Sequence, residues 1–221
     1  MLGVALEGGG ARGAFHVGAI KALLEEGYEI DGIVGTSIGA FNAAMIAQGD
    51  FEKCFDMWCN ISPKQLFNIE DRHMANILKK NLNIKTITYF SSEAKKIISN
   101  RGIDTENLRK VVDQLIDEDK LRKSNIDFGL VTVELGPISP IEMFKEDIPN
   151  GKLKDYIMAS ARYPGLKMEP LDGKVYLDGG IYDNCPVSLL AKKNYDKIIA
   201  IRLNSSKKLK YVDDNINVVE I

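Results

Sequence analysis

The stretch GIVGTSIGAFNAAMIAQG, residues 32–49, decides the fold. Its first residues, Gly32-Ile33-Val34, predict a short buried strand, and the run from Ile38 to Gln48 predicts a helix that a glycine ends. Between them lies Gly35-Thr36-Ser37-Ile38-Gly39, a G-x-S-x-G turn typical of a nucleophile elbow when it joins a strand to a helix. The flanking glycines allow a sharp turn, and the helix N-terminus favours developing negative charge. We therefore expect Ser37 to be a nucleophile; the alternative is a tight turn whose serine only caps the helix.

A second glycine-rich turn, Gly8-Gly9-Gly10-Ala11-Arg12-Gly13, follows the apolar run Val4-Ala5-Leu6 and precedes a helical pattern that ends at Glu26. Consecutive N–H groups that no side chain crowds suit an oxyanion or a phosphate equally well. Since both glycine turns follow strands, one can present a nucleophile while the other holds the oxyanion. Arg12 either anchors this loop, meets an anionic head group, or is an exposed arginine at the start of the helix.

The same loop matches the G-x-G-x-x-G pattern of dinucleotide sites through Gly8, Gly10 and Gly13. Such a site needs an acidic residue at the carboxyl end of the second strand. Asp31 has nearly the right spacing, but it precedes the strand and is expected at the opposite end. This placement disfavours a dinucleotide site.

A serine nucleophile needs a base, and neither histidine is well placed. His16 follows the apolar Phe15 on the first helix and is expected to be packed, while His73 lies in a charged segment and is expected in solvent. No histidine follows Asp178, as the Ser…Asp…His order of α/β-hydrolases requires.

Asp178 itself is the better candidate base. Leu177-Asp178-Gly179-Gly180 predicts a carboxylate at the end of a strand, with two glycines that allow close approach. An ordinary aspartate has a pKa near about 4, so this one would have to be desolvated and hydrogen-bonded to the serine. A turn-forming Asp-Gly is the alternative.

The order of strand and helix patterns predicts an α/β fold with three α/β/α layers around a central, mainly parallel sheet. Residues 50–125 are mostly helical and charged, and we interpret them as a helical insertion beside the sheet. A helix is expected over residues 153–161. Strand patterns return at residues 126–133, 141–144, 174–177, 198–201 and 218–221. A length of 221 residues suits a single domain spanning residues 1–221.

Composition narrows the function classes. The formal charge of −2 provides no basic footprint for nucleic acid, and three cysteines without a CxxC pair predict free thiols and no zinc site. The N-terminus lacks the basic region of a signal peptide. The apolar stretch from Ile33 to Ala47 falls short of the about 20 residues that a membrane span needs. We expect a cytoplasmic protein whose membrane contact, if any, is peripheral.

Three ordered motifs resemble the patatin-like phospholipases: the Gly8–Gly13 loop, the Gly35–Gly39 elbow and Asp178-Gly179-Gly180. Ala159-Ser160 with Pro164 is also similar to the family's segment before that aspartate. The resemblance covers Met1 to about Leu203.

By this resemblance, Ser37 is the nucleophile and Asp178 the base of a Ser–Asp dyad. The amides of Gly9 and Gly10, with the backbone of Arg12, would hold the oxyanion. The resemblance implies no metal and no organic cofactor, and hydrolysis of acyl esters of phospholipids and other lipids. Family domains usually continue beyond the strand that ends at Ile221, so we expect a short member or part of a longer domain.

Two other functions stay open: a soluble carboxylesterase or acyltransferase on the same dyad, and a non-catalytic lipid- or nucleotide-binding module. The oligomeric state is not predicted. Two lysine pairs, Lys79-Lys80 and Lys95-Lys96, either face anionic lipid or lie on solvated helix faces. Apolar side chains that either belong to the core or form an acyl pocket near Ser37 are Phe41, Met45, Phe55, Trp58 and Leu66.

Overall fold

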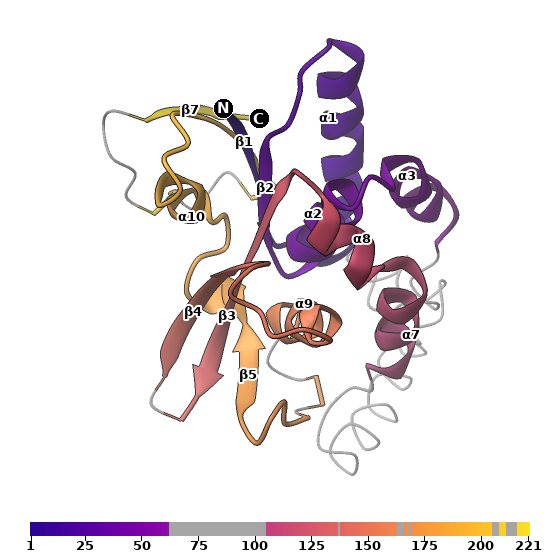
Figure 1. The fold of residues 1–221 in the computed structure, drawn as a ribbon, viewed down its shortest axis with the longest axis vertical. Helices are drawn as coiled ribbons and strands as arrows, with labels where there is room; N and C mark the ends of the chain where they lie inside the picture. The colour runs from indigo at the N-terminus through magenta and orange to yellow at the C-terminus, as the bar shows by residue number, and fades with distance from the viewer. Residues whose placement is uncertain (62–104, 137, 163–165, 168, 205–207, 211–215) are drawn as a thin grey trace, which may run out of the picture.

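A computed structural model describes residues 1–61, 105–136, 138–162, 166–167, 169–204, 208–210 and 216–221 (Figure 1). Its strands are β1 (Leu2–Leu6), β2 (Gly32–Thr36), β3 (Asp127–Leu135), β4 (Ser139–Phe144), β5 (Val175–Asp178), β6 (Lys197–Ile201) and β7 (Asn217–Glu220). Its helices are η1 (Gly10–Gly13), α1 (Ala14–Glu25), α2 (Ile38–Ala47), α3 (Phe51–Asn60), α7 (Glu106–Leu115), α8 (Glu118–Lys123), α9 (Leu153–Ser160), η2 (Gly179–Ile181) and α10 (Val187–Ala191).

The strands form one sheet in the order β4-β3-β2-β1-β6-β7, and β5 pairs with β3 off this path. The five strands β1, β2, β3, β6 and β7 run parallel, because each successive pair among them is parallel. Among the described strands, only β4 and β5 run antiparallel to β3. The predicted α/β fold with a mainly parallel sheet is confirmed.

Helices cover both faces of the sheet, as Figure 1 shows, with α10 on one side and α1, α2 and α9 on the other. Side chains along β1 alternate between two cores because successive residues of a strand point to opposite faces. Val4 and Leu6 belong to the larger core, and Ala5 belongs to the core under α10. These two cores account for the three predicted layers.

The predicted helical insertion is only partly described. Its described parts, α3, α7 and α8, are helices as expected. The rest of the predicted range, residues 62–104, lies outside the described residues. No described helix combines the length and apolar character needed to cross a bilayer.

Two glycines let α2 pack directly against the strands. A Cβ on Gly35 would lie 2.2 Å from the carbonyl carbon and oxygen of Gly39, and a Cβ on Gly39 would lie 2.3 Å from the carbonyl oxygen of Leu6. Real Cβ atoms do not approach backbone this closely, so both positions need glycine. This contact places the N-terminus of α2 at the carboxyl end of β1 and β2.

We predict that Gly35→Ala unfolds or severely destabilises the protein, by about 3 kcal/mol or more, because the new methyl group meets backbone atoms that cannot move independently. Gly18→Ala is the matched control. Gly18 is exposed in α1, and a methyl group added there would meet no heavy atom within 4 Å, so this variant should gain roughly 0.5–1 kcal/mol from helix propensity. Urea unfolding followed by circular dichroism measures both. A Gly35→Ala protein as stable as Gly18→Ala would contradict the close packing.

Candidate active site

Ser37 lies at the turn between β2 and α2 in a strained conformation. Its φ of 57° and ψ of −126° lie outside the regions that a non-glycine residue usually adopts. Its side chain makes no capping hydrogen bond to the described backbone, unlike a serine that only caps a helix. The hydroxyl instead lies near enough to the Asp178 carboxyl to lower the pKa of that group.

The strand register brings these two residues together from opposite ends of the chain. In β2 and β3, Thr36 pairs with Val131, and in β3 and β5, Thr132 pairs with Asp178. The residue after Thr36 and the last residue of β5 are therefore both neighbours of the same point on β3. This geometry explains how Ser37 and Asp178 meet although β2 and β5 do not pair directly.

Asp178 is buried, with 5% of its surface exposed. Burial raises the pKa of its carboxyl above the usual value, and hydrogen bonds from the Ser37 side chain and the Gly180 backbone offset part of this increase. The Gly180 N–H donates to Oδ1 at 2.7 Å. A carboxylate in this setting is a stronger base than one in water.

Of the two glycines after Asp178, Gly179 is needed for close packing against backbone, whereas a Cβ on Gly180 would meet only side-chain atoms. A Cβ on Gly179 would lie 2.1 Å from the carbonyl oxygen of Val131. A Cβ on Gly180 would lie 2.5 Å from Oδ1 of Asn184. The strand end that holds Asp178 therefore sits directly against β3.

The glycine-rich loop offers fewer N–H groups than its sequence suggests. Those of Gly9 and Gly10 have no hydrogen-bond partner among the described residues. The N–H of Gly8 donates to the carbonyl of Asn184 at 2.8 Å, and that of Arg12, expected to assist, donates to Gly9 at 3.3 Å. The N–H groups of Gly9 and Gly10 are therefore not used by the described backbone, and Gly10 lines the same cavity as Ser37.

Arg12 anchors the loop, one of the roles considered for it. Its Nη1 donates to the carbonyl of Leu203 at 2.6 Å, and its Nε lies 3.5 Å from the carbonyl of Gly9. Ala11 is exposed on the outer surface of the same turn. The arginine therefore connects the loop to the chain that follows β6.

Glu7 and Asn184 also support the loop, and the sequence did not single them out. The Glu7 carboxylate is buried and accepts the N–H groups of Leu203 and Asn204 at 2.5 and 2.7 Å. Asn184 donates to the carbonyl of Gly8 at 3.0 Å and to Glu7 at 3.2 Å. The sequence feature that could have pointed to Glu7 is its position, because it is an acidic residue directly after a buried strand.

His16 is a buried structural residue, as expected. Burial lowers its pKa to about 3, and its Nδ1 lies 3.3 Å from the side-chain amide of Asn42. Asn42 donates to the carbonyl of Gly13 at 3.0 Å and accepts from Trp58 at 2.8 Å. Asn42 thus joins α2 to the end of the glycine loop. His73 lies outside the described residues.

An apolar cavity of about 50 Å³ opens beside Ser37. Of the predicted pocket residues that the structure describes, only Phe41 lines it. Met45, Phe55 and Trp58 pack in or against the core instead, and Leu66 and both lysine pairs lie outside the described residues. The cavity is lined by Gly10, Ser37, Ile38, Phe41, Leu108, Val112, Ile157, Met158 and Ala161.

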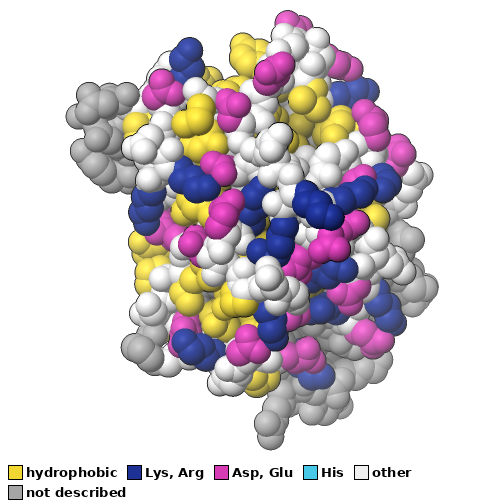
Figure 2. Space-filling view, in the orientation of Figure 1, with side chains coloured by type: hydrophobic (Ala, Val, Ile, Leu, Met, Phe, Trp, Pro, Cys, Tyr) yellow, Lys and Arg dark blue, Asp and Glu magenta, His cyan; other side chains and the backbone are white. Residues whose placement is uncertain are grey.

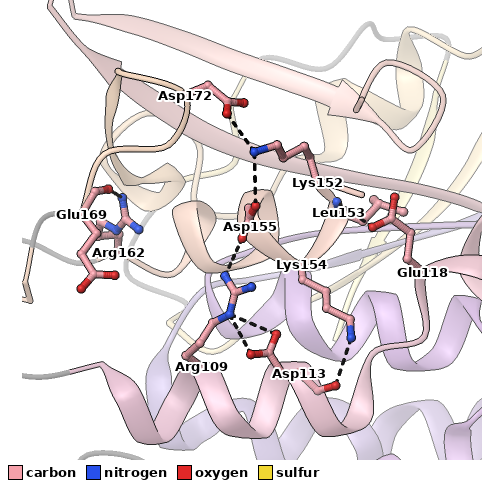
Figure 3. Close-up of polar contacts among 10 residues, drawn as sticks. All are labelled: Arg109, Asp113, Glu118, Lys152, Leu153, Lys154, Asp155, Arg162, Glu169 and Asp172. Carbon is pink, nitrogen blue, oxygen red and sulfur yellow. Dashed lines mark hydrogen bonds and ion pairs between the residues drawn. The ribbon is translucent and has the colours of Figure 1, made fainter. Parts of the chain in front are cut away.

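Two helices that the sequence did not connect to the site, α7 and α9, form much of this wall. One ion pair joins them, Arg109 of α7 with Asp155 of α9, as Figure 3 shows. Arg109 contacts Asp155 at 2.5 Å and Asp113 at 3.0 Å, and Lys152 contacts Asp155 at 3.8 Å and Asp172 at 2.8 Å. Exposed pairs of this kind contribute about 0–1 kcal/mol each, so they add little to the stability of the cavity wall.

Other candidate sites find little support in the described residues. No group of three or more His, Cys, Asp or Glu side chains is arranged there to hold a metal ion. Asp31 accepts the N–H of Leu2 at 2.7 Å, so it lies at the sheet edge opposite Ser37, where a dinucleotide ribose would not reach it. On the face shown in Figure 2, basic and acidic side chains are interspersed and form no continuous basic band among the described residues.

The sequence profile of the family described as patatin-like phospholipase matches residues 4–191. This chain belongs to that family. The match covers the glycine loop, the elbow and the Asp178 motif, and it confirms the resemblance that these motifs suggested.

Relatives of this patatin-like chain include an uncharacterized NTE family protein of Mycobacterium tuberculosis. It is 30% identical over 213 residues, which cover 92% of this chain and 49% of that protein. Neuropathy target esterase sws of Drosophila melanogaster is 28% identical over 216 residues, 92% of this chain and 13% of the esterase. The chain thus spans about half the length, or less, of these relatives.

Among solved structures, VipD from Legionella pneumophila matches with a TM-score of 0.53 at 17% identity, over 99% of this chain and 49% of VipD. At this identity the likeness concerns the fold alone. It agrees with the mainly parallel sheet of the patatin-like chain.

We predict that His16 makes stability fall in mild acid. Its folded pKa of about 3 lies below the ordinary value of 6.5, so between these values the unfolded state binds a proton that the folded state excludes. In His16→Leu this contribution is absent. The stability of the wild type relative to the variant should therefore decrease by about 2 kcal/mol from pH 7 to pH 5. Urea unfolding at several pH values measures the difference, and a constant difference would mean that His16 titrates normally.

Proposed function

We propose that this chain is a serine acyl hydrolase that cleaves fatty-acyl esters of lipids through Ser37 and Asp178. The observation that carries the proposal is that the strand register brings the Ser37 hydroxyl to the buried Asp178 carboxyl, whose pKa it lowers, next to an apolar cavity. Membership of the patatin-like phospholipase family supports a lipid substrate. One relative, the neuropathy target esterase sws, is named for ester chemistry, which supports an ester substrate here.

In the first half of the reaction, Oγ of Ser37 attacks the ester carbonyl carbon while Asp178 accepts the hydroxyl proton. The carbonyl oxygen becomes an oxyanion, which the N–H groups of Gly9 and Gly10 stabilise. When the tetrahedral intermediate collapses, the carbon–oxygen bond to the alcohol breaks. Asp178 then returns its proton to the leaving alcohol, and the acyl group stays on Ser37.

In the second half, Asp178 accepts a proton from a water molecule that attacks the acyl-enzyme. The intermediate collapses, the acid leaves, and the proton returns to Oγ of Ser37. Both halves use the same base, because none of the described residues that line the cavity beside Ser37 offers another acid or base. The burial of Asp178 suits this role, since it moves the pKa of the carboxyl toward neutral pH.

The apolar lining suits an acyl chain. Phe41 from α2, Val112 from α7 and Met158 from α9 approach Ser37 from different elements, so a chain bound there would be surrounded by hydrocarbon. Binding from a membrane surface would require only peripheral contact, which we include in the proposal together with a cytoplasmic location.

A second candidate function is a soluble carboxylesterase or acyltransferase with the same dyad. The small size of the cavity, about 50 Å³, favours it, because a short acyl group fills such a space more easily than a long one. Vesicle and soluble substrates distinguish the two.

We predict that a fluorophosphonate probe labels the wild type and does not label Ser37→Ala. Asp178→Asn should lower turnover by about 10²–10⁴-fold, the usual contribution of a general base. Asn can still accept the Gly180 N–H, so the fold should persist, and circular dichroism checks this. A folded wild type that is not labelled would point to the non-catalytic module instead.

The pH dependence of ester turnover tests whether Asp178 is the base. Asp178 must be ionised to accept a proton, and its pKa is raised by burial. Activity should therefore fall as the pH decreases through this raised pKa, at a higher pH than for an ordinary carboxyl near about 4. A profile that falls only at the ordinary value would argue against Asp178 as the base.

We predict that the wild type releases fatty acid from phosphatidylcholine vesicles and that Ser37→Ala does not. Mass spectrometry of the products identifies the position cleaved, and soluble p-nitrophenyl esters of increasing chain length are assayed in parallel. Hydrolysis of short soluble esters without any release from vesicles would favour the second candidate.

A further inference from the structure

The hydrogen-bond ladder between β2 and β3 ends where the elbow begins. Thr36 is the last residue of β2 and pairs with Val131. At Ser37 the chain turns away from the sheet with a φ of 57°, so its N–H leaves the line of the ladder. Without another partner, this N–H, which lies near the carbonyl of Val131, would lack a hydrogen bond.

The hydroxyl of Ser160, at the end of α9, lies between these two groups. The N–H of Ser37 donates to Oγ of Ser160 at 2.9 Å, and Oγ donates to the carbonyl of Val131 at 2.7 Å. A serine hydroxyl has one hydrogen to donate, so both contacts together fix its orientation. Ser160 is fully buried, with 0% of its surface exposed.

The same segment holds the backbone of the base. The N–H of Asp178 donates to the carbonyl of Arg162 at 2.8 Å. The carbonyl of Val131, which accepts from Ser160, is also the atom nearest to a Cβ placed on Gly179. Residues 160–162 therefore contact the backbones of both Ser37 and Asp178.

We propose that Ser160 is a positioning residue that sets the backbone of Ser37 relative to Asp178. This inference rests on the proposed function, because it assigns Ser160 to the support of that dyad. Ser160 does not act on the substrate itself, since its hydroxyl is buried and both of its contacts are to the protein backbone. The Ser160 hydroxyl gives the N–H of Ser37 the hydrogen-bond partner that β3 no longer supplies at the elbow.

The test compares kinetic constants of Ser160→Ala with those of the wild type on a soluble p-nitrophenyl ester. We expect kcat per active site to fall by about 10- to 100-fold, as small misplacements of reacting groups do, while KM changes less than about twofold. Titration with the fluorophosphonate probe counts the competent sites, so loss of folded protein does not imitate the effect.

The pH profile separates positioning from a general structural role. The Ser37 hydrogen bond lowers the pKa of Asp178, so weakening this bond should move the midpoint of the activity profile to higher pH in Ser160→Ala. A loss of stability alone would lower the amplitude and leave the midpoint unchanged. Ser160→Thr keeps the donor and the acceptor, and it should recover most of the lost kcat and the wild-type midpoint.

Tyr195→Phe is the matched control. Like Ser160→Ala, it removes a buried hydroxyl. This hydroxyl donates to Asp127 at 3.0 Å, at the opposite end of the strands from Ser37. Its kcat and pH midpoint should equal those of the wild type. Equal constants for Ser160→Ala and Tyr195→Phe, in a wild type that labels and turns over, would overturn the role of Ser160. An unlabelled wild type would instead reject the proposed function.

Discussion

The sharp turn at Ser37 is the constraint on which the rest of the site depends. A non-glycine residue in such a conformation costs about 1–3 kcal/mol, so other interactions must hold it there. The helix that follows supplies them, because Phe41, Met45 and Ile46 are at least 95% buried and each contributes about 1.5–3 kcal/mol. Their sum exceeds the strain. Gly35 and Gly39 allow the contact with the sheet through which this burial occurs.

Buried polar side chains then determine where the parts of the site lie. Four of them form hydrogen bonds with the backbone of different segments at the carboxyl edge of the sheet. They are Glu7, Thr36, Asn42 and Ser160. A buried polar group without a partner is costly, so each of these residues favours one arrangement of its neighbours over the alternatives. The groups around Ser37 are thereby arranged before any substrate arrives.

The strand, turn and helix around Ser37 could be predicted from the sequence, whereas the contacts between distant segments could not. The strand at Ile33-Val34, the turn at Ser37 and the helix behind it follow from periodicity and glycine placement. The cavity walls do not, because every residue from Gly39 to Ala47 is buried and no polar face marks the side toward Ser37. The sequence pattern therefore offers Met45 for a pocket whose walls α7 and α9 in fact provide. The contacts of Asn184 with Glu7 and Gly8 join residues 176 or more positions apart, beyond any local pattern.

Helix α9 and the residue after it contribute both to the cavity wall, through Ile157, Met158 and Ala161, and to the support of the catalytic turn, through Ser160. If the proposed function holds, selectivity and rate are therefore not independent traits. In the proposed mechanism, a substitution on α9 that reshapes the wall for a different chain length would also shift the residue that holds the N–H of Ser37. Evolution or engineering toward new substrates would thus meet fewer constraints on α7, which lines the cavity and whose described hydrogen bonds do not involve the Ser37 turn.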